Sequence, residues 1–352
     1  MRIEQLTFTR FIAAISIVIF HYGKEVNIFY NDYTSFIFRQ ANVGVSYFFI
    51  LSGFVMIIAY GNREKINLLK YLNNRFARIY PLYLLAILLI LVIKLFKNID
   101  KIDLILNLSM LQSWFTNKAL TLNFPGWSLS VELFFYLTFP LLFNYFYSKK
   151  KLKHICVWII IFFILSQTIY HLIINKFIEL PYYNIKDIYY HPLMHFNEFL
   201  IGNLAGLYFI KKFKSTQKNY LTPIFLTILI LIVLLKFPSG LNYHNGLLSI
   251  VFIPLIILIS SSNDKLTKLF SKKIFTFLGE ISFGIYILQV PVWSIFSDYR
   301  MDKYFGFNKE NDFTESFFMR ILILILLSSL SYLFFEKPIR NKIKTTHNNG
   351  YM

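Results

Sequence analysis

Apolar runs long enough to cross a lipid bilayer recur along the whole of this chain. Ten are predicted to be transmembrane helices: about 6–22, 43–61, 79–96, 128–147, 155–174, 196–210, 219–237, 246–262, 274–296 and 317–335. Backbone polar groups inside a bilayer must be paired within their own segment, so such runs fold as helices. The expected fold is therefore all-α, a polytopic membrane helical bundle. The stretch 104–115 is apolar but short, and we expect a packed or interfacial helix there.

The distribution of basic residues indicates the orientation of the bundle. With a cytoplasmic N-terminus, the predicted inside segments hold 22 of the 36 lysines and arginines and the outside segments hold 11. This alternation predicts ten spans with both termini in the cytoplasm. The formal net charge of +18 then reflects topology, and nucleic acid is not an expected partner. Membrane lipids are the expected surroundings.

No segment is long enough and polar enough to form a separate soluble domain. We expect a membrane domain over 1–340 and a disordered cytoplasmic tail over 341–352, and the loops 97–127 and 175–195 are too short to fold alone. Tyr22-Gly23-Lys24 does not resemble a signal-peptide cleavage site, so the first span is expected to be retained. Cys156 is the only cysteine, which argues against disulfides and thiol metal clusters, and no metal site is expected.

Two ionisable residues lie in the first predicted span. Arg10 and His21 are eleven residues apart, which in a helix puts both on one face about 16 Å apart along the axis. Ionisable groups inside a membrane are costly and are functional candidates by default. In the predicted orientation His21 lies in the outer half, where an imidazole suits general base catalysis on a hydroxyl. The alternative is that His21 only reaches the membrane interface, and the residues alone leave the two readings about even.

A second group of candidates enters the fourth span from the outside. Trp127, Ser128, Ser130 and Glu132 lie in the segment Trp-Ser-Leu-Ser-Val-Glu. Glu132 is at a depth similar to that of His21, and contact between them would orient the imidazole and stabilise its charged form. The alternatives are an anionic residue favoured by the helix dipole and, for Trp127, an interfacial anchor.

Arg75 and Arg78 precede the third predicted span on the inside. Their spacing puts them on one helix face, and guanidinium groups match the geometry of phosphates. From these residues alone, a purely topological role is the stronger reading.

Three further carboxylates lie in or beside later spans. Glu198 follows His195 by one turn and precedes Gly202 and Gly206, small residues that allow close helix packing. Glu280 is near the inner end of the ninth span, where the helix dipole favours its negative charge. Glu336 closes the tenth span, and we interpret it as a structural partner for an inside arginine.

The ordered set of motifs resembles the acyltransferase-3 family of integral membrane O-acyltransferases. The match covers nearly the whole chain and consists of Arg10 with His21, Phe-Phe-Ile-Leu-Ser-Gly-Phe at 48–54, Arg75 with Arg78, Trp127 to Glu132, Glu198 to Gly202, Leu278 to Ser282 with Tyr286, and a final Phe-Glu-x-Pro. Three positions depart from the family pattern: Gln289 stands where many members have histidine, His195 where many have arginine, and Thr7 where the family has an acidic residue.

The resemblance implies a bacterial inner-membrane enzyme that moves an acyl group, usually acetyl, from cytoplasmic acyl-CoA to a sugar hydroxyl. The acceptor is expected to be a cell-surface polysaccharide such as O-antigen or exopolysaccharide, or its lipid-linked oligosaccharide precursor. Acyl-CoA is a donor substrate, and no permanently bound cofactor is expected. Polysaccharide-assembly proteins are candidate partners.

The hypothesis that follows gives each candidate residue a role. His21, Glu132 and Arg10 are the catalytic candidates, and Arg75 and Arg78 hold the phosphates of the donor. Trp127, Ser130, Glu198, Tyr286 and Gln289 are substrate-contacting or structural candidates. Two alternatives stay open: a transporter or flippase of a lipid-linked glycan, which the absence of a visible internal repeat disfavours, and a scaffold subunit of a polysaccharide assembly.

Overall fold

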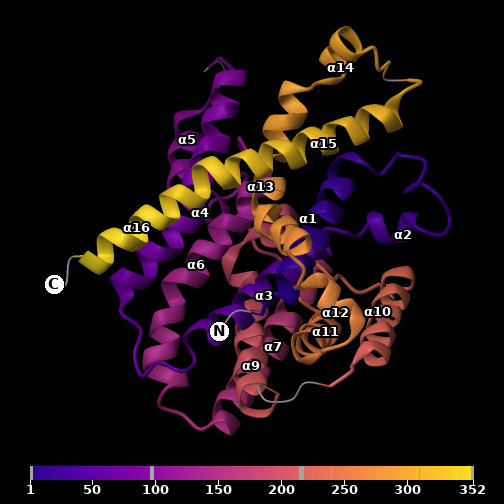
Figure 1. Ribbon diagram of the computed structural model, residues 1–352. Helices are drawn as coiled ribbons and strands as arrows, with labels where there is room; N and C mark the ends of the chain where they lie inside the picture. Colours follow the sequence, from indigo (N-terminus) through magenta and orange to yellow (C-terminus); the bar gives the residue numbers. More distant parts are fainter. Residues whose placement is uncertain (1–2, 96–98, 214–217, 239, 309, 350–352) are drawn as a thin grey trace.

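All elements of the computed structural model are helical in the residues it describes, which are 3–95, 99–213, 218–238, 240–308 and 310–349 (Figure 1). The side chains of 344–349 are not described. In chain order the elements are α1 Gln5–Tyr22, α2 Ser35–Phe38, α3 Val43–Tyr60, α4 Leu68–Ile93, α5 Lys101–Leu108, η1 Gln112–Trp114, η2 Phe124–Gly126, α6 Trp127–Leu142, η3 Phe143–Tyr147, α7 Leu152–Ile174, α8 Ile185–Tyr190, α9 Pro192–Lys212, α10 Leu221–Lys236, α11 Ser249–Ser261, α12 Lys265–Phe270, α13 Lys273–Ile295, α14 Asp298–Phe305, α15 Phe313–Ser331, η4 Tyr332–Glu336 and α16 Lys337–Asn349.

Seven helical segments among the described residues are long and apolar enough to cross a membrane. They are Gln5–Tyr22, Val43–Tyr60, Leu68–Ile93, Phe124–Tyr147, Leu152–Ile174, Lys273–Ile295 and Phe313–Ile343. The other three predicted spans also form helices, but α10 and α11 have only 16 and 13 residues. The remaining one, α9, buries several polar side chains, among them Asn197, Glu198 and Asn203. The count of ten and the orientation of the termini stay predictions.

Two helix boundaries differ from the sequence prediction in ways that matter for the site. α4 begins at Leu68, where the Asn67 side chain accepts a hydrogen bond from the Lys70 amide, and not at residue 79. Arg75 and Arg78 therefore lie inside a helix and not before one. At the other end of the chain, α15, η4 and α16 follow one another without a break, so helix extends to Asn349 across much of the tail predicted to be disordered. Residues 350–352 lie outside the described residues.

The predicted short helix at 104–115 is indeed not a span. α5 covers Lys101–Leu108 and is capped by Asp100, whose carboxylate accepts from the Ile102 amide, and a single 3-10 turn follows at Gln112–Trp114. This segment packs over α4: the hydroxyl groups of Tyr80 and Tyr83 donate to the backbone carbonyls of Leu108 and Asn107.

The most extensive helix contact among the described residues is between α3 and α9, and glycine makes it possible. A Cβ atom added to Gly202 would lie 2.1 Å from the Ile50 carbonyl oxygen, and one added to Gly53 would lie 2.2 Å from the Phe199 carbonyl oxygen. Small residues let two helix backbones approach in this way. α1 and α13 meet similarly, since a Cβ on Gly279 would lie 1.9 Å from the Thr7 carbonyl oxygen.

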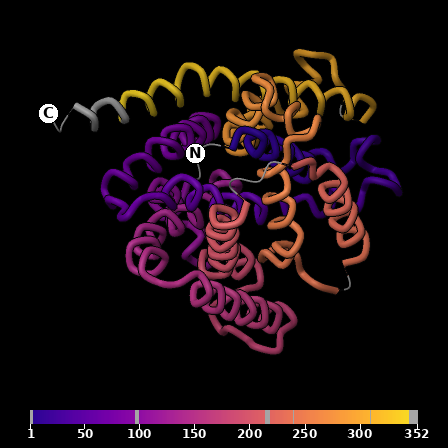
Figure 2. The backbone as a smooth tube through the Cα atoms, turned by 60° about the horizontal axis from the view of Figure 1, so that its bottom comes forward, coloured from indigo at the N-terminus to yellow at the C-terminus, as the bar shows by residue number. Residues whose placement is uncertain are grey.

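α3 packs against α9 and also contacts α1, which in turn packs along α13. Figure 2 shows the long run of α15, η4 and α16 lying across one side of this arrangement, and its η4 and α16 parts pack against α4. The polar interior described below is enclosed by α1, α3, α4, α6 and α13.

We predict that Gly202→Ala destabilises the protein. The added methyl group would force α3 and α9 apart, which we expect to cost about 1–3 kcal/mol. Thermal unfolding of the purified protein in detergent measures this. Tyr208→Ala, at an exposed position of the same helix, is the control and should change the melting temperature little. Equal melting temperatures for Gly202→Ala and the wild type would contradict the close contact.

Candidate active site

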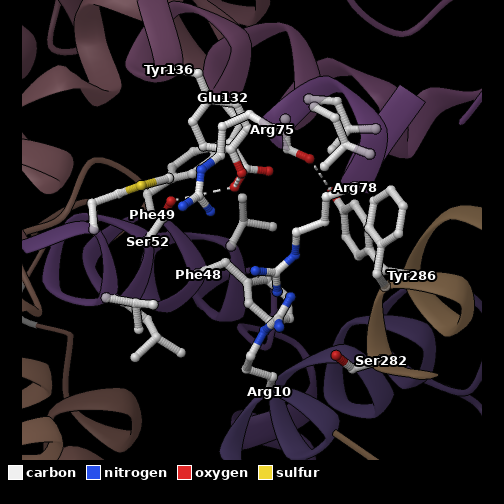
Figure 3. Close-up of a pocket in the computed structure, with 18 residues that line it drawn as sticks. Arg10, Phe48, Phe49, Ser52, Arg75, Arg78, Glu132, Tyr136, Ser282 and Tyr286 are labelled. Atoms are coloured by element: carbon white, nitrogen blue, oxygen red, sulfur yellow. Dashed lines mark hydrogen bonds between the residues drawn. The ribbon is translucent and has the colours of Figure 1, made fainter. Parts of the chain in front are cut away.

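A cavity of about 110 Å³ opens between α1, α3, α4, α6 and α13 (Figure 3). Apolar and aromatic side chains such as Phe48 and Phe49 form part of its wall. The polar side chains that line it are Arg10, Ser52, Arg75, Arg78, Ser128, Glu132, Tyr136, Ser282 and Tyr286. Three guanidinium groups thus face one carboxylate, so this wall carries an excess of positive charge.

Arg75 is held in place by aromatic rings. Its guanidinium carbon lies 5.6, 5.4 and 5.8 Å from the ring centres of Tyr60, Tyr71 and Tyr136. One of its terminal nitrogens donates to the Tyr60 hydroxyl at 3.4 Å, whereas its Nε is buried without a hydrogen-bond partner among the described residues. Cation–π contacts stabilise the charge without neutralising it, so Arg75 stays available to an anion in the cavity.

Arg10 and Arg78 reach into the cavity from α1 and α4, and their guanidinium groups face one another (Figure 3). At an effective dielectric constant of 20, two unit charges about 4 Å apart interact by about 4 kcal/mol. An anion placed between two guanidinium groups is attracted by both, which outweighs their mutual repulsion. The arrangement is therefore suited to a phosphate or another compact anion.

Glu132 lies one turn into α6 and points into the same cavity. Its carboxylate accepts hydrogen bonds from the Tyr136 hydroxyl and, at 3.3 Å, from the Ser52 hydroxyl. The sequence suggested that Glu132 meets His21, but the hydrogen bonds of Glu132 go to these two hydroxyl groups instead. Glu132 is thus placed to partner the arginines of the cavity, and it is not the group that orients the imidazole.

His21 lies at the last turn of α1, half-buried, with its ring edge-on to Phe124 at 4.6 Å between centres. Its Nδ1 atom is 2.6 Å from the side-chain oxygen of Gln289 on α13. His21 is not among the described residues that line the cavity. Arg10 and His21 lie on the same helix, as the sequence predicts, but Arg10 lines the cavity and His21 does not.

Tyr286 and Ser128 form a hydrogen-bonded pair at the cavity wall, close in sequence to the residues that contact His21. Tyr286 and Ser128 line the cavity, and the Tyr286 hydroxyl is 2.9 Å from the Ser128 hydroxyl and 3.1 Å from the Pro125 carbonyl oxygen. One helical turn further along α13 stands Gln289, and one turn before Ser128 stands Phe124, and both contact His21. The residues around His21 are therefore close in sequence to those that line the cavity.

A second, smaller cavity shares Arg10, Arg78 and Phe283 with the first and is completed by Glu280, Tyr332, Glu336 and Arg340. The Tyr332 hydroxyl donates to Glu280 at 2.8 Å, and Arg340 lies 3.8 Å from the same carboxylate. Glu336 lines this cavity together with three arginines, and its role as a structural partner for an inside arginine stays a prediction. Two carboxylates, Glu280 and Glu336, line this second cavity, whereas Glu132 is the carboxylate that lines the first. The excess of positive charge is therefore larger in the first cavity.

Trp127 and Glu198 belong to a separate buried cluster. The two ring nitrogens of His195 lie 2.7 Å from the Glu198 carboxylate and 2.8 Å from the Tyr189 carbonyl oxygen, so both face acceptors. Trp127 packs on His195 and His244, with ring centres 5.2 and 5.6 Å apart. This cluster holds the start of α6 in place, and through it Ser128 and Glu132.

The departure at position 195 still gives Glu198 a buried hydrogen-bond partner, because Nδ1 of His195 lies 2.7 Å from its carboxylate and both residues are fully buried. Burial, and to a lesser degree the neighbouring His195, lower the pKa of His244 to about 3. His244 is therefore neutral at neutral pH.

Ser130 is a structural residue in this arrangement. It is fully buried, and its hydroxyl oxygen accepts from the Ser113 amide at 3.4 Å, which ties α6 to the loop around η1. Of the sequence candidates, Arg10, Arg75, Arg78, Glu132 and Tyr286 are brought together in the cavity. His21 and Gln289 form a pair beyond it.

The sequence analysis missed Tyr136, Ser52 and the tyrosines around Arg75. Tyr136 follows Glu132 by one helical turn, so its position on the same face was available from spacing alone. Ser52 lies in the Phe-Phe-Ile-Leu-Ser-Gly-Phe motif, but nothing in the spacing shows that it meets Glu132. Tyr60 and Tyr71 come from two helices, and their convergence on Arg75 needs the fold.

Comparison with known proteins gives a family match over nearly the whole chain. The model of the family described as "Acyltransferase domain" matches residues 3–336. Acyltransferase MdmB of Streptomyces mycarofaciens is 34% identical over 155 residues, covering 40% of this chain and 39% of that protein. O-acetyltransferase OatA of Staphylococcus aureus is 23% identical over 330 residues, covering 85% of this chain and 53% of that protein.

An uncharacterised protein of Haemophilus influenzae is 29% identical over 249 residues, covering 62% of this chain and 98% of that protein. The chain spans between about two fifths and half of the length of the two named relatives. No solved structure matches it.

We predict that the first cavity binds compact polyanions. Inorganic pyrophosphate should raise the melting temperature of the purified protein in detergent, because it would bind the folded state at the facing guanidinium groups. Arg78→Gln should weaken this binding about 10- to 100-fold, the loss expected when a charged hydrogen bond of about 1.5–3 kcal/mol is removed.

Arg63→Gln is the matched control, because Arg63 is exposed beyond the end of α3 and does not line the cavity. It should keep the wild-type response. If Arg78→Gln and the wild type respond equally to pyrophosphate, the cavity is not the anion site.

Proposed function

Because the chain belongs to this acyltransferase family, we propose that it is a membrane O-acyltransferase that moves an acyl group from cytoplasmic acyl-CoA to a sugar hydroxyl. The acyl group is acetyl in this proposal, which the name of the O-acetyltransferase relative supports. The acceptor is a cell-surface polysaccharide, of the O-antigen or exopolysaccharide type, or its lipid-linked precursor. The protein acts in the bacterial inner membrane alongside polysaccharide-assembly proteins, and it holds no permanent cofactor.

The observation that carries the proposal is the cavity lined by three guanidinium groups and one carboxylate. Acyl-CoA is a long molecule whose phosphates are concentrated at one end and whose thioester is at the other. Arg10, Arg75 and Arg78 match the phosphate end in charge and geometry. A donor of this shape needs a cavity that is cationic at one end and leads toward the reacting group.

The direction of the cavity supports donor entry from the side predicted to be cytoplasmic. Arg75 and Arg78 lie in the first half of α4, and the loop before that helix carries Arg63 and Lys65. Basic loops gather on the cytoplasmic side of membrane proteins. His21, at the opposite end of α1 from Arg10, is then on the side from which a surface glycan arrives.

His21 acts as the general base in this proposal. The imidazole takes the proton of the sugar hydroxyl while the hydroxyl oxygen forms a bond to the acyl carbon. The carbon–sulfur bond breaks, and the thiolate of CoA leaves and receives the proton from the imidazolium. In this proposal the thioester reaches His21 from the end of the cavity lined by Tyr286 and Ser128.

We predict that His21→Ala lowers acetyl transfer about 10²- to 10⁴-fold, the range that general base catalysis contributes. The measurement is transfer of labelled acetyl from acetyl-CoA to the surface glycan in membranes, with the amount of folded protein determined in parallel. His154→Ala, at an exposed position of α7, is the matched control and should retain activity.

Full acetylation by His21→Ala would remove this mechanism. A purified protein that moves a lipid-linked glycan between liposome leaflets, and never labels it from acetyl-CoA, would favour the transporter alternative.

We predict that Arg75→Lys raises the KM for acetyl-CoA more than it lowers kcat. Lysine keeps the charge but loses the planar group that stacks on Tyr60, Tyr71 and Tyr136 and pairs with two phosphate oxygens at once. Initial rates at varied acetyl-CoA concentration measure both constants, with Arg63→Lys as control. An unchanged KM would mean that Arg75 has only a structural or topological role.

A further inference from the structure

Gln289 is a fully buried residue of α13 whose side-chain amide is fixed at both ends. Its Nε2 lies 2.5 Å from the backbone carbonyl oxygen of Tyr286, and its Oε1 lies 2.6 Å from Nδ1 of His21. Together the two contacts determine the orientation of the Gln289 amide and which ring nitrogen of His21 carries a hydrogen atom.

The orientation of the amide follows from the Tyr286 contact. A carbonyl oxygen only accepts hydrogen bonds, so the NH₂ group of Gln289 must be the end that faces it. The amide oxygen is then the end that faces His21. An amide oxygen also only accepts, so Nδ1 of His21 must carry a hydrogen atom. In the neutral ring the lone pair is therefore on Nε2.

We propose that Gln289 is a positioning residue that holds His21 as the Nδ1–H tautomer, with Nε2 as the atom that takes the proton from the acceptor hydroxyl. The catalytic role of Nε2 rests on the proposed function, whereas the tautomer follows from the two hydrogen bonds alone. Nε2 of His21 has no hydrogen-bond partner among the described residues, and the ring is half-buried. A hydroxyl arriving from the outer side thus has access to the free lone pair.

The surroundings of the ring make Gln289 its main polar contact. Phe124 from η2 and Phe20 and Tyr22 from α1 pack on it through their rings. Lys24 is the charged group close enough to act on the imidazole, and its ammonium lies 3.8 Å from the centre of the Phe20 ring. A neutral amide fixes the tautomer without stabilising the charged ring as a carboxylate would.

This assignment gives the departure from the family pattern a physical meaning. A histidine at position 289 would itself be able to donate or accept, and it would itself titrate. Glutamine has neither freedom: with its amide anchored on Tyr286, it offers only an oxygen to His21. The pH at which His21 becomes a competent base is then set without a second titrating group.

The experiment compares Gln289→Glu and Gln289→Met with the wild type. Glutamate keeps the size and the acceptor toward His21 but loses the NH₂ group that donates to the Tyr286 carbonyl oxygen. In its ionised form it adds a negative charge that stabilises the imidazolium, so a higher pH is needed to free Nε2. The acidic limb of the pH–rate profile should move up by about 1 to 3 pH units. Methionine keeps the size but loses the acceptor, and kcat should fall about 10- to 100-fold with little change in KM, the cost typical of removing the partner that orients an imidazole.

A second readout does not depend on catalysis. Diethyl pyrocarbonate modifies only the neutral imidazole, so its reaction with His21 across pH, followed by mass spectrometry, reports when the ring loses its proton. Gln289→Glu should move the midpoint of this modification to higher pH by the same amount as the rate profile. Gln167→Met is the matched control, because Gln167 also donates to a backbone carbonyl, that of Asn245, at 2.5 Å but lies away from His21. It should leave both curves where the wild type has them.

The outcomes separate the two claims. A modification midpoint that is the same in Gln289→Glu and the wild type would overturn the role of Gln289, whatever the activity. A shifted midpoint in a protein that never transfers acetyl would support the positioning role and refute the proposed function. Equal effects of Gln289→Met and Gln167→Met on kcat would also overturn the inference, since a general loss of packing would then explain both.

Discussion

Unbalanced positive charge in the interior is the constraint on which the rest of this structure depends. A buried guanidinium group is tolerated when it is paired or caged, and the first cavity supplies three such groups with one carboxylate. Tyrosine rings stabilise Arg75, hydroxyl groups hold Glu132 in place, and the facing pair Arg10 and Arg78 is left for an anion. The glycine contacts between α1 and α13 and between α3 and α9 hold the cavity walls at the required distance. Fold and charge thus depend on one another.

The sequence predicted the class of fold and most of the cavity residues, because both leave signals that are local. Apolar runs report helices whatever their neighbours are, and the spacing of Arg75 and Arg78 reports a shared face. Their partners were harder to predict. Periodicity places Glu132 and His21 at similar depths, but depth does not say which way each helix is turned. Glu132 turns toward Ser52 on α3, and His21 turns toward Gln289 on α13.

The helix boundaries show the same limit. The window of apolar residues begins at 79, yet α4 begins at Leu68, because Asn67 caps it and Tyr71 is buried against its neighbours. A hydropathy window does not detect this extension, because its first turn is exposed and only the following Tyr71 is buried. Likewise α9 is held in the bundle by glycine contacts and by the His195–Glu198 pair, which hydropathy counts against it. Tertiary packing therefore determines where α4 begins and keeps α9 in the bundle.

The run α15–η4–α16 has a π-helical turn at Tyr332–Glu336, directly beside the second cavity. A π turn carries one residue more than the α-helical turn it replaces, which changes the angular phase of everything that follows it. Tyr332, Glu336 and Arg340 consequently face the same cavity although they are spread over two turns. Deleting one residue here would preserve the helix and its length almost unchanged, yet rotate Arg340 by about 100°. The angular position of its residues, more than their hydrophobicity, therefore decides whether this helix can line the second cavity.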